Sequence, residues 1–223
     1  MASSNVILRG DHTVAVAQDK LIRNTYSLLA MTLLFSAAMS ALALKLEVGN
    51  GISIACSLGA LALVWLVLPK AAHSASGIGV VFAITGLLGF GLGPVLSTYL
   101  SLPHGSHVVM TAMGGTAAIF VSLSAYILVT RRDFSFMGGF LFVGMLVVIG
   151  ASLLNLFFAM PAVTLATSAA VVLLMSGFIL FDTSRIVNGG ETNYVLATVS
   201  LYLSIFNLFI SLLQLVGFAN RDD

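Results

Sequence analysis

Asp182 is the residue whose chemistry most needs an explanation, because it closes a long run of apolar residues. A carboxylate at the centre of a bilayer costs about 3 kcal/mol on insertion scales, so acids in membrane helices usually pair with a base or serve a function. Arg185 follows three residues later, on the same face of a helix. Asp182 is therefore either an interfacial acid neutralised by Arg185 or a titratable group that blocks an ion path.

Other polar side chains lie inside apolar runs. Ser204 and Asn207 are three residues apart in the last run, which predicts that they face together; Gln214 lies in the same run and Asn155 in the fifth run. Such groups either line a cavity or bond across helices. His104 and His107 have the spacing of two metal ligands, but no third ligand is near in the sequence, so we expect exposed loop histidines.

Motifs of known enzyme chemistry are absent from the chain. It has no His-Glu-x-x-His, no Gly-x-Ser-x-Gly and no phosphate-binding glycine loop. An intramembrane aspartyl protease needs two acids, and the part of the chain expected inside the membrane offers only Asp182, at the end of the sixth apolar run. The one cysteine, Cys56, excludes an internal disulfide and a paired-cysteine metal site. We therefore expect no catalysis, no cofactor and no metal.

Composition indicates that lipid is the solvent. The chain has 223 residues, of which 59% are hydrophobic and only 8% are charged, whereas a soluble domain has roughly 25% charged residues. A net charge of +1 provides no basic face for nucleic acid. We expect the lipid bilayer, and not nucleic acid, to be the first partner of this protein.

Seven apolar stretches dominate the sequence, and none contains Lys, Arg, Asp or Glu. Each is close to the ~20 residues that a helix needs to cross a bilayer. Continuous rather than alternating hydrophobicity favours helices over barrel strands. The sequence therefore predicts an all-α membrane protein with seven transmembrane helices, at approximately 24–44, 51–68, 78–100, 107–129, 137–158, 162–181 and 194–217.

Basic residues gather at alternate ends of these stretches, which predicts a cytoplasmic N-terminus and a periplasmic C-terminus. The expected domains are a cytoplasmic tail over 1–23, a transmembrane domain over 24–217 and a short periplasmic tail over 218–223. The side predicted to be cytoplasmic holds seven basic residues and the other side two: Arg9, Lys20, Arg23, Lys70, Arg131, Arg132 and Arg185, against Lys45 and Arg221.

The third stretch contains Gly89, Gly93 and Pro94. The two glycines share a helix face and let another backbone approach closely. Pro94 cannot donate to the carbonyl of Phe90, so a kink is expected. This segment is either a hinge or a site of close helix packing.

Three segments together resemble the Bax inhibitor family of seven-helix membrane proteins. They read GFGLGPVL at 89–96, AMGGTAAIF at 112–120 and FDT at 181–183. Further segments resemble the YccA branch of that family, and the resemblance runs from about residue 20 to the C-terminus. These further segments are 23–26, 135–139, 189–194 and 197–202.

The resemblance implies a partner, the membrane protease FtsH, an AAA+ enzyme that YccA-like proteins bind and restrain. Such proteins are also slow substrates, engaged through the N-terminal tail, which here carries Arg9, Asp11 and Lys20. An extended tail of ~22 residues reaches at most ~75 Å, enough to enter a protease pore. The alternative is an ordinary disordered terminus.

Other members of the family are pH-sensitive calcium leak channels, in which two aspartates on the last two helices share a proton. Asp182 matches the first of them, and Ser204 stands at the position that matches the second. A serine cannot share the charge, because the upward push on the pKa comes from two close carboxylates. The resemblance therefore favours protease regulation here, with a Ca²⁺ or cation leak as the alternative.

Overall fold

The structure is a computed structural model that describes residues 2–74 and 76–220, with side chains from Val16 onward. Every regular element in these ranges is a helix. The elements are α1 (Ala2–Lys45), α2 (Asn50–Ala62), the π-helical turn η1 (Leu63–Val67), α3 (Leu68–Ala71), α4 (Ser76–Gly91), α5 (Gly93–Leu100), α6 (Gly105–Thr130), the 3₁₀ turn η2 (Ser135–Met137), α7 (Gly138–Phe158), α8 (Pro161–Val187) and α9 (Tyr194–Ala219).

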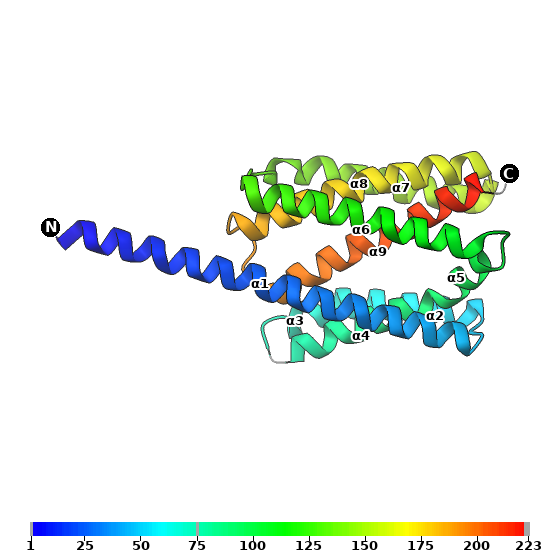
Figure 1. The fold of residues 1–223 in the computed structure, drawn as a ribbon, viewed down its shortest axis with the longest axis horizontal. Helices are drawn as coiled ribbons and strands as arrows, with labels where there is room; N and C mark the ends of the chain where they lie inside the picture. The colour runs from blue at the N-terminus through cyan, green and yellow to red at the C-terminus, as the bar shows by residue number, and fades with distance from the viewer. Residues whose placement is uncertain (1, 75, 221–223) are drawn as a thin grey trace.

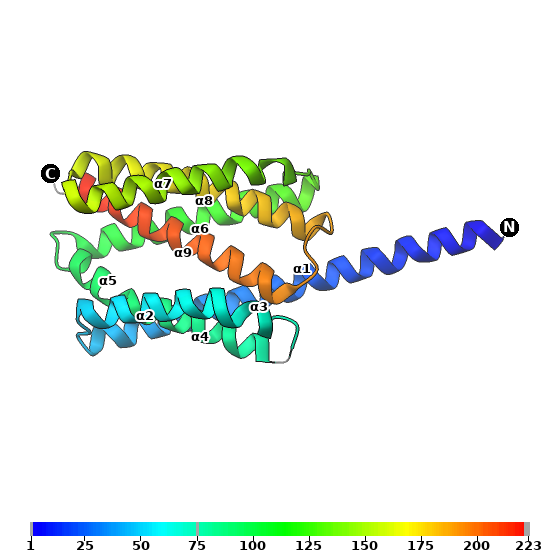
Figure 2. The ribbon, with the colours of Figure 1, turned by 180° about the vertical axis from the view of Figure 1, so that it is seen from behind.

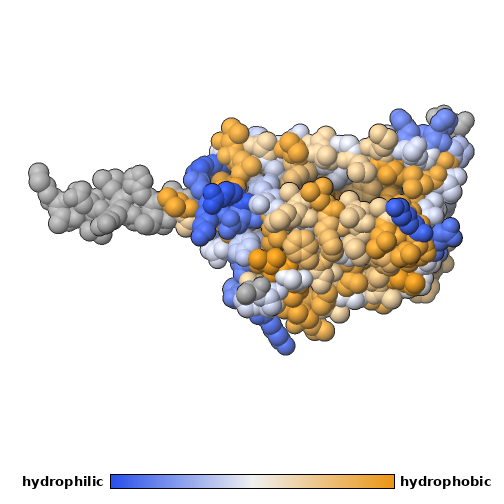
Figure 3. All heavy atoms as spheres, turned by 60° about the horizontal axis from the view of Figure 1, so that its bottom comes forward, coloured by the Kyte–Doolittle hydropathy of each residue, from blue (hydrophilic) through white to orange (hydrophobic). Residues whose placement is uncertain are grey.

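These helices form seven candidate membrane spans within the described residues, which confirms the predicted fold class. The second span joins α2, η1 and α3, and the third joins α4 and α5. Large apolar side chains cover the outside: Trp65 is 74% exposed and Phe157 84%. Figure 3 shows the resulting apolar band between two hydrophilic ends. A soluble monomer rarely exposes so much contiguous apolar surface, so the band faces lipid.

Helix α9 crosses the middle of the bundle, with α1, α2 and α4 on one side and α6, α7 and α8 on the other (Figure 1). It packs against α1, α4, α6 and α8. Helices α2 and α7 lie outermost, and the chain ends at the opposite end of the bundle from its start (Figure 2). The central helix is thus the one from which side chains reach both halves of the molecule.

The third span is interrupted at Leu92, between α4 and α5, as Pro94 predicts. The interruption alters the hydrogen bonding of the carbonyl groups beside it, and the Ser53 hydroxyl of α2 donates to the carbonyl oxygen of Gly91.

A Cβ at Gly89 would overlap the carbonyl oxygen of Ser36, and one at Gly93 would lie 2.6 Å from the Cβ of Ala43. Close packing of α1 on α4 and α5 is confirmed, whereas hinge motion stays a prediction.

The N-terminal tail differs from the extended segment that we expected, because the backbone is already helical from Ala2. Figure 1 shows this part of α1 projecting beyond the bundle. At 1.5 Å per residue, 22 helical residues span roughly 33 Å rather than ~75 Å. Lys20 is exposed; the side chains of Arg9 and Asp11, and residues 221–223 of the expected periplasmic tail, lie outside the described part of the structure.

Candidate functional site

Asp182 lies on α8, five residues before that helix ends at Val187, and only 6% of its surface is exposed. The Ser200 hydroxyl of α9 donates a hydrogen bond of 2.5 Å to its Oδ2. A buried carboxylate is tolerated only when hydrogen bonds or an opposite charge compensate for its lost solvation. The Ser200 bond supplies this compensation and joins α8 to α9.

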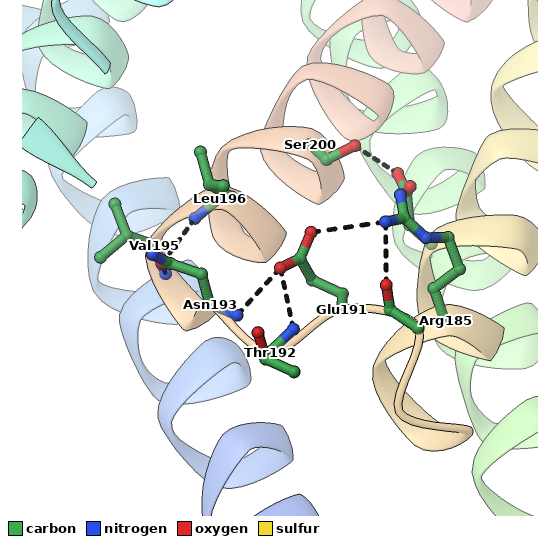
Figure 4. A network of polar contacts seen from close by, with 9 residues as sticks. Arg185, Glu191, Thr192, Asn193, Val195, Leu196 and Ser200 are labelled. Carbon is green, nitrogen blue, oxygen red and sulfur yellow. Dashed lines mark hydrogen bonds and ion pairs between the residues drawn. The ribbon is translucent and has the colours of Figure 1, made fainter. Parts of the chain in front are cut away.

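Arg185 does not form an ion pair with Asp182, so the predicted pairing is wrong. Its Nη2 lies 3.7 Å from Oε2 of Glu191 and donates to the Gly190 carbonyl at 3.0 Å. The guanidinium also lies 5.5 Å from the ring centroid of Phe181. Figure 4 shows Arg185 directed toward Glu191. The chain after α8 folds back and brings a second acid to a more exposed position, where the guanidinium keeps part of its hydration.

The connection 188–193, which we call the α8–α9 strap, is held at both ends. Glu191 Oε1 accepts hydrogen bonds from the backbone amides of Thr192 and Asn193, each at 2.9 Å. Asn193 caps α9 by accepting from Val195 N at 2.9 Å (Figure 4). Its Nδ2 donates to the Ala72 carbonyl at 2.8 Å. A fixed strap sets the register in which α8 and α9 pack.

The connection between α6 and α7 docks on the same end of α8. Ser184 Oγ accepts a hydrogen bond of 2.8 Å from the amide of Phe134 and donates to the Arg132 carbonyl at 3.2 Å. Hydrogen bonds from Ser135 hold the pKa of the exposed Asp133 carboxyl below its usual value. Asp182 therefore lies beside two ordered connections at the end of the bundle where the N-terminal helix enters.

Ser204 and Asn207 do not face together. Ser204 is buried, whereas Asn207 is exposed and donates to the Leu203 carbonyl of its own helix at 2.8 Å. Three residues on a helix leave a rotation of about 60°, which is enough to separate a core position from a peripheral one. Ser204 and Asn207 therefore lie on different faces of α9 and do not line one cavity together.

Ser200 is the partner that sequence reasoning missed, although a signal for it exists. Asp182 stands five residues before the end of α8, and Ser200 stands six residues after α9 begins at Tyr194. In two antiparallel helices joined by a short connection, residues equally far from that connection lie side by side. Ser204 is one turn too deep to reach Asp182.

The other polar residues singled out in the sequence are accounted for individually. Asn155 Nδ2 donates to Thr164 Oγ1 at 2.7 Å, between α7 and α8, and the Ser168 hydroxyl donates to Gln214 Oε1 at 2.5 Å, between α8 and α9. Interhelical bonding is therefore confirmed for Asn155 and Gln214. His104 and His107 are exposed, and the described residues contain no group of three potential metal ligands.

Replacing Ser200 with alanine should destabilise the bundle by about 1–3 kcal/mol, because the Asp182 carboxylate would be left buried without its donor. Ser204→Ala is the matched control, since Ser204 lies on the same helix and is more deeply buried than Ser200 but has no side-chain hydrogen bond in the described structure. The measurement is the free energy of unfolding in lipid bicelles. Equal losses for the two variants would contradict a specific role for Ser200.

Comparison with known proteins agrees with this architecture. Residues 18–222 match the family model described as Inhibitor of apoptosis-promoting Bax1. The Modulator of FtsH protease YccA of Escherichia coli K12 is 47% identical over 212 residues, which cover 95% of this chain and 96% of the relative. An uncharacterized membrane protein of Vibrio cholerae is 45% identical, with 92% of each chain covered.

A Pseudomonas aeruginosa protein of uncharacterized function is also 45% identical and covers 94% of this chain. The names of the Escherichia coli relatives describe a protease modulator and an inner membrane protein, not an enzyme. With the family model matched over nearly the whole chain and seven apolar helices in the structure, this protein belongs to the Bax inhibitor family and is a multi-pass inner-membrane protein.

Proposed function

We propose that this protein binds and restrains an FtsH-type membrane protease, without catalysis of its own, and that it is itself a slow substrate. The observation that carries the proposal is the 47% identity, over nearly the full length of both chains, to a relative named as a modulator of that protease. Identity at this level over a whole chain supports a shared partner as well as a shared fold.

The architecture narrows where such a protease would make contact. The connections between spans in the described residues are short, and the longest is the α8–α9 strap. The surfaces left for a partner are the helical tail before the first span and the apolar outer faces, which include the peripheral helices α2 and α7. We propose that the tail engages the protease pore and that the outer faces meet its membrane segments.

The proposal requires the N-terminus to be cytoplasmic, and the charge distribution supports this. Lys20, Lys70, Arg131 and Arg185 lie at or near the ends of alternate spans that share one end of the bundle with the N-terminal helix, whereas Lys45 lies at the other end. Basic residues flanking spans favour the cytoplasmic side. We therefore place the end with the tail, the strap and Asp182 in the cytoplasm.

Deleting residues 2–15 should slow degradation of this protein by the protease, because the remaining chain would start close to the membrane surface. The measurement is the half-life of the chain with the protease in proteoliposomes. A variant with residues 2–15 in scrambled order is the control, since it keeps length and composition. Unchanged turnover of the deletion variant would contradict the tail as the point of engagement.

A calcium or cation leak is the second candidate, and the observation that favours it is a carboxylate, Asp182, buried in a membrane helix without an ion pair. Its hydrogen-bond partner is, however, the hydroxyl of Ser200 and not a second acid. Sharing of a proton between two carboxylates, which makes such a gate sensitive to pH, is therefore not supported.

Calcium flux into liposomes, measured across a pH series, separates the two candidates. We expect the parent protein and Asp182→Asn to show the same flux as empty liposomes at each pH, because the Asp182 carboxylate is hydrogen-bonded to the Ser200 hydroxyl and not to a second acid. A pH-dependent flux that Asp182→Asn alters, with both proteins correctly inserted, would establish the leak and overturn this expectation.

A further inference from the structure

Three helices meet in a buried chain of hydrogen bonds near the middle of the bundle. Ser36 Oγ of α1 lies 2.6 Å from the Tyr202 hydroxyl of α9, and that hydroxyl donates to the Thr85 carbonyl of α4 at 3.3 Å. Because a phenol has one proton to give, Ser36 is the donor to Tyr202. Ser36 is 8% exposed and Tyr202 1%.

The same serine lies against bare backbone on its other side. A Cβ at Gly89 of α4 would overlap the Ser36 carbonyl oxygen and lie 2.5 Å from Ser36 Oγ. A Cβ at Gly86 would lie 2.8 Å from the Phe35 ring. Helix α1 is therefore confined between the glycines of α4 and the Tyr202 ring, so movement at Ser36 breaks the hydrogen bond.

This contact lies on the path of any force applied to the N-terminus. Helix α1 is unbroken from Ala2 to Lys45, so tension on its first residues passes directly to Ser36. The polar contacts met before Ser36 are longer: Tyr26 OH lies 3.4 Å from Thr183 Oγ1, and Thr198 Oγ1 donates to the Thr25 carbonyl at 3.3 Å. Ser36–Tyr202 is the shortest hydrogen bond between α1 and another helix in the described structure.

The surroundings make this bond slow to replace once it is broken. Ser36, Thr85 and Tyr202 all lie inside candidate membrane spans. In hydrocarbon no water is available to take over a lost partner, so separated polar groups stay unpaired until helices rearrange. Backbone atoms of α1 and α4 in direct contact add packing that is lost in the same step.

We propose that the hydrogen-bond chain Ser36–Tyr202–Thr85, with Ser36 seated on Gly89, is a clamp that resists extraction of the protein from its N-terminus. This assignment rests on the proposed function only where it concerns the protease: the clamp then sets how slowly a protease that pulls on the tail can remove the chain. The mechanical part stands on the contacts alone.

The test is to pull the protein by its N-terminus out of a lipid bilayer and to measure the rate at which the first helix leaves at a fixed force. Tyr202→Phe keeps the ring and its stacking on Phe206 but removes the hydroxyl, and Ser36→Ala removes the other partner. Each should leave the bilayer about three- to tenfold faster than the parent, the range expected for one interhelical hydrogen bond in a membrane.

Ser168→Ala is the matched control. It removes a hydroxyl bond of 2.5 Å to Gln214, also between α9 and a neighbour, but the neighbour is α8 and not α1. Its first-helix extraction rate should equal that of the parent. Parental rates for Tyr202→Phe and Ser36→Ala, or an equal acceleration by Ser168→Ala, would overturn the clamp.

A second readout separates the clamp from the proposed function. With an FtsH-type protease in proteoliposomes, Tyr202→Phe should be degraded faster than the parent and Ser168→Ala at the parental rate. Faster extraction by force without any degradation by the protease would confirm the clamp and contradict the proposed function. Degradation at the parental rate despite faster extraction would show that the protease does not pull against the clamp.

Discussion

Helix α9 carries polar side chains that bind three different helices, in a medium where no water can substitute for them. Thr198 and Tyr202 bind α1, Tyr202 also binds α4, and Ser200 binds the carboxylate of α8. Near the far end Gln214 accepts from Ser168 of α8. Backbone polar groups in a bilayer must be satisfied within the protein, and a buried side-chain group without a partner is costly. These bonds therefore fix the depth and rotation of α1, α4 and α8 relative to α9.

This arrangement gives the interior of the bundle and its outer surface different chemistry. Polar side chains point inward to contact α9, while the outer elements present large apolar side chains, such as Trp65 in η1 and Phe157 in α7. An exterior of this kind suits contact with lipid and with the membrane segments of a partner. A centre cross-linked by hydrogen bonds suits a chain that is hard to dismantle, which is the property that the proposed function requires.

The features that could be predicted from the sequence were those that depend on the residues of a single segment. Seven charge-free stretches predict the spans, Pro94 predicts the interruption at Leu92, and Gly89 predicts the close approach of another backbone. Each depends on local chemistry: apolar length, a missing amide and a missing side chain. Family resemblance extended this to the fold as a whole, which the match over residues 18–222 confirms.

Contacts between distant segments were harder to predict from the sequence, because they depend on how far each helix is shifted along its neighbour. The i, i+3 rule places Arg185 near Asp182, but the α8–α9 strap returns Glu191 to the arginine instead. The same strap aligns Ser200, and not Ser204, with Asp182. The pairing of Ser36 with Tyr202 joins residues 166 positions apart, and no local pattern encodes such a distance.

The most direct test of the account is the rate at which an FtsH-type protease degrades a second membrane-protein substrate in proteoliposomes, with and without an excess of this protein in the same membrane. Restraint of the protease predicts slower degradation of that substrate as the amount of this protein rises, and no slowing when an unrelated seven-helix protein replaces it. Degradation at an unchanged rate, with this protein inserted in the same orientation and in excess, would contradict the account.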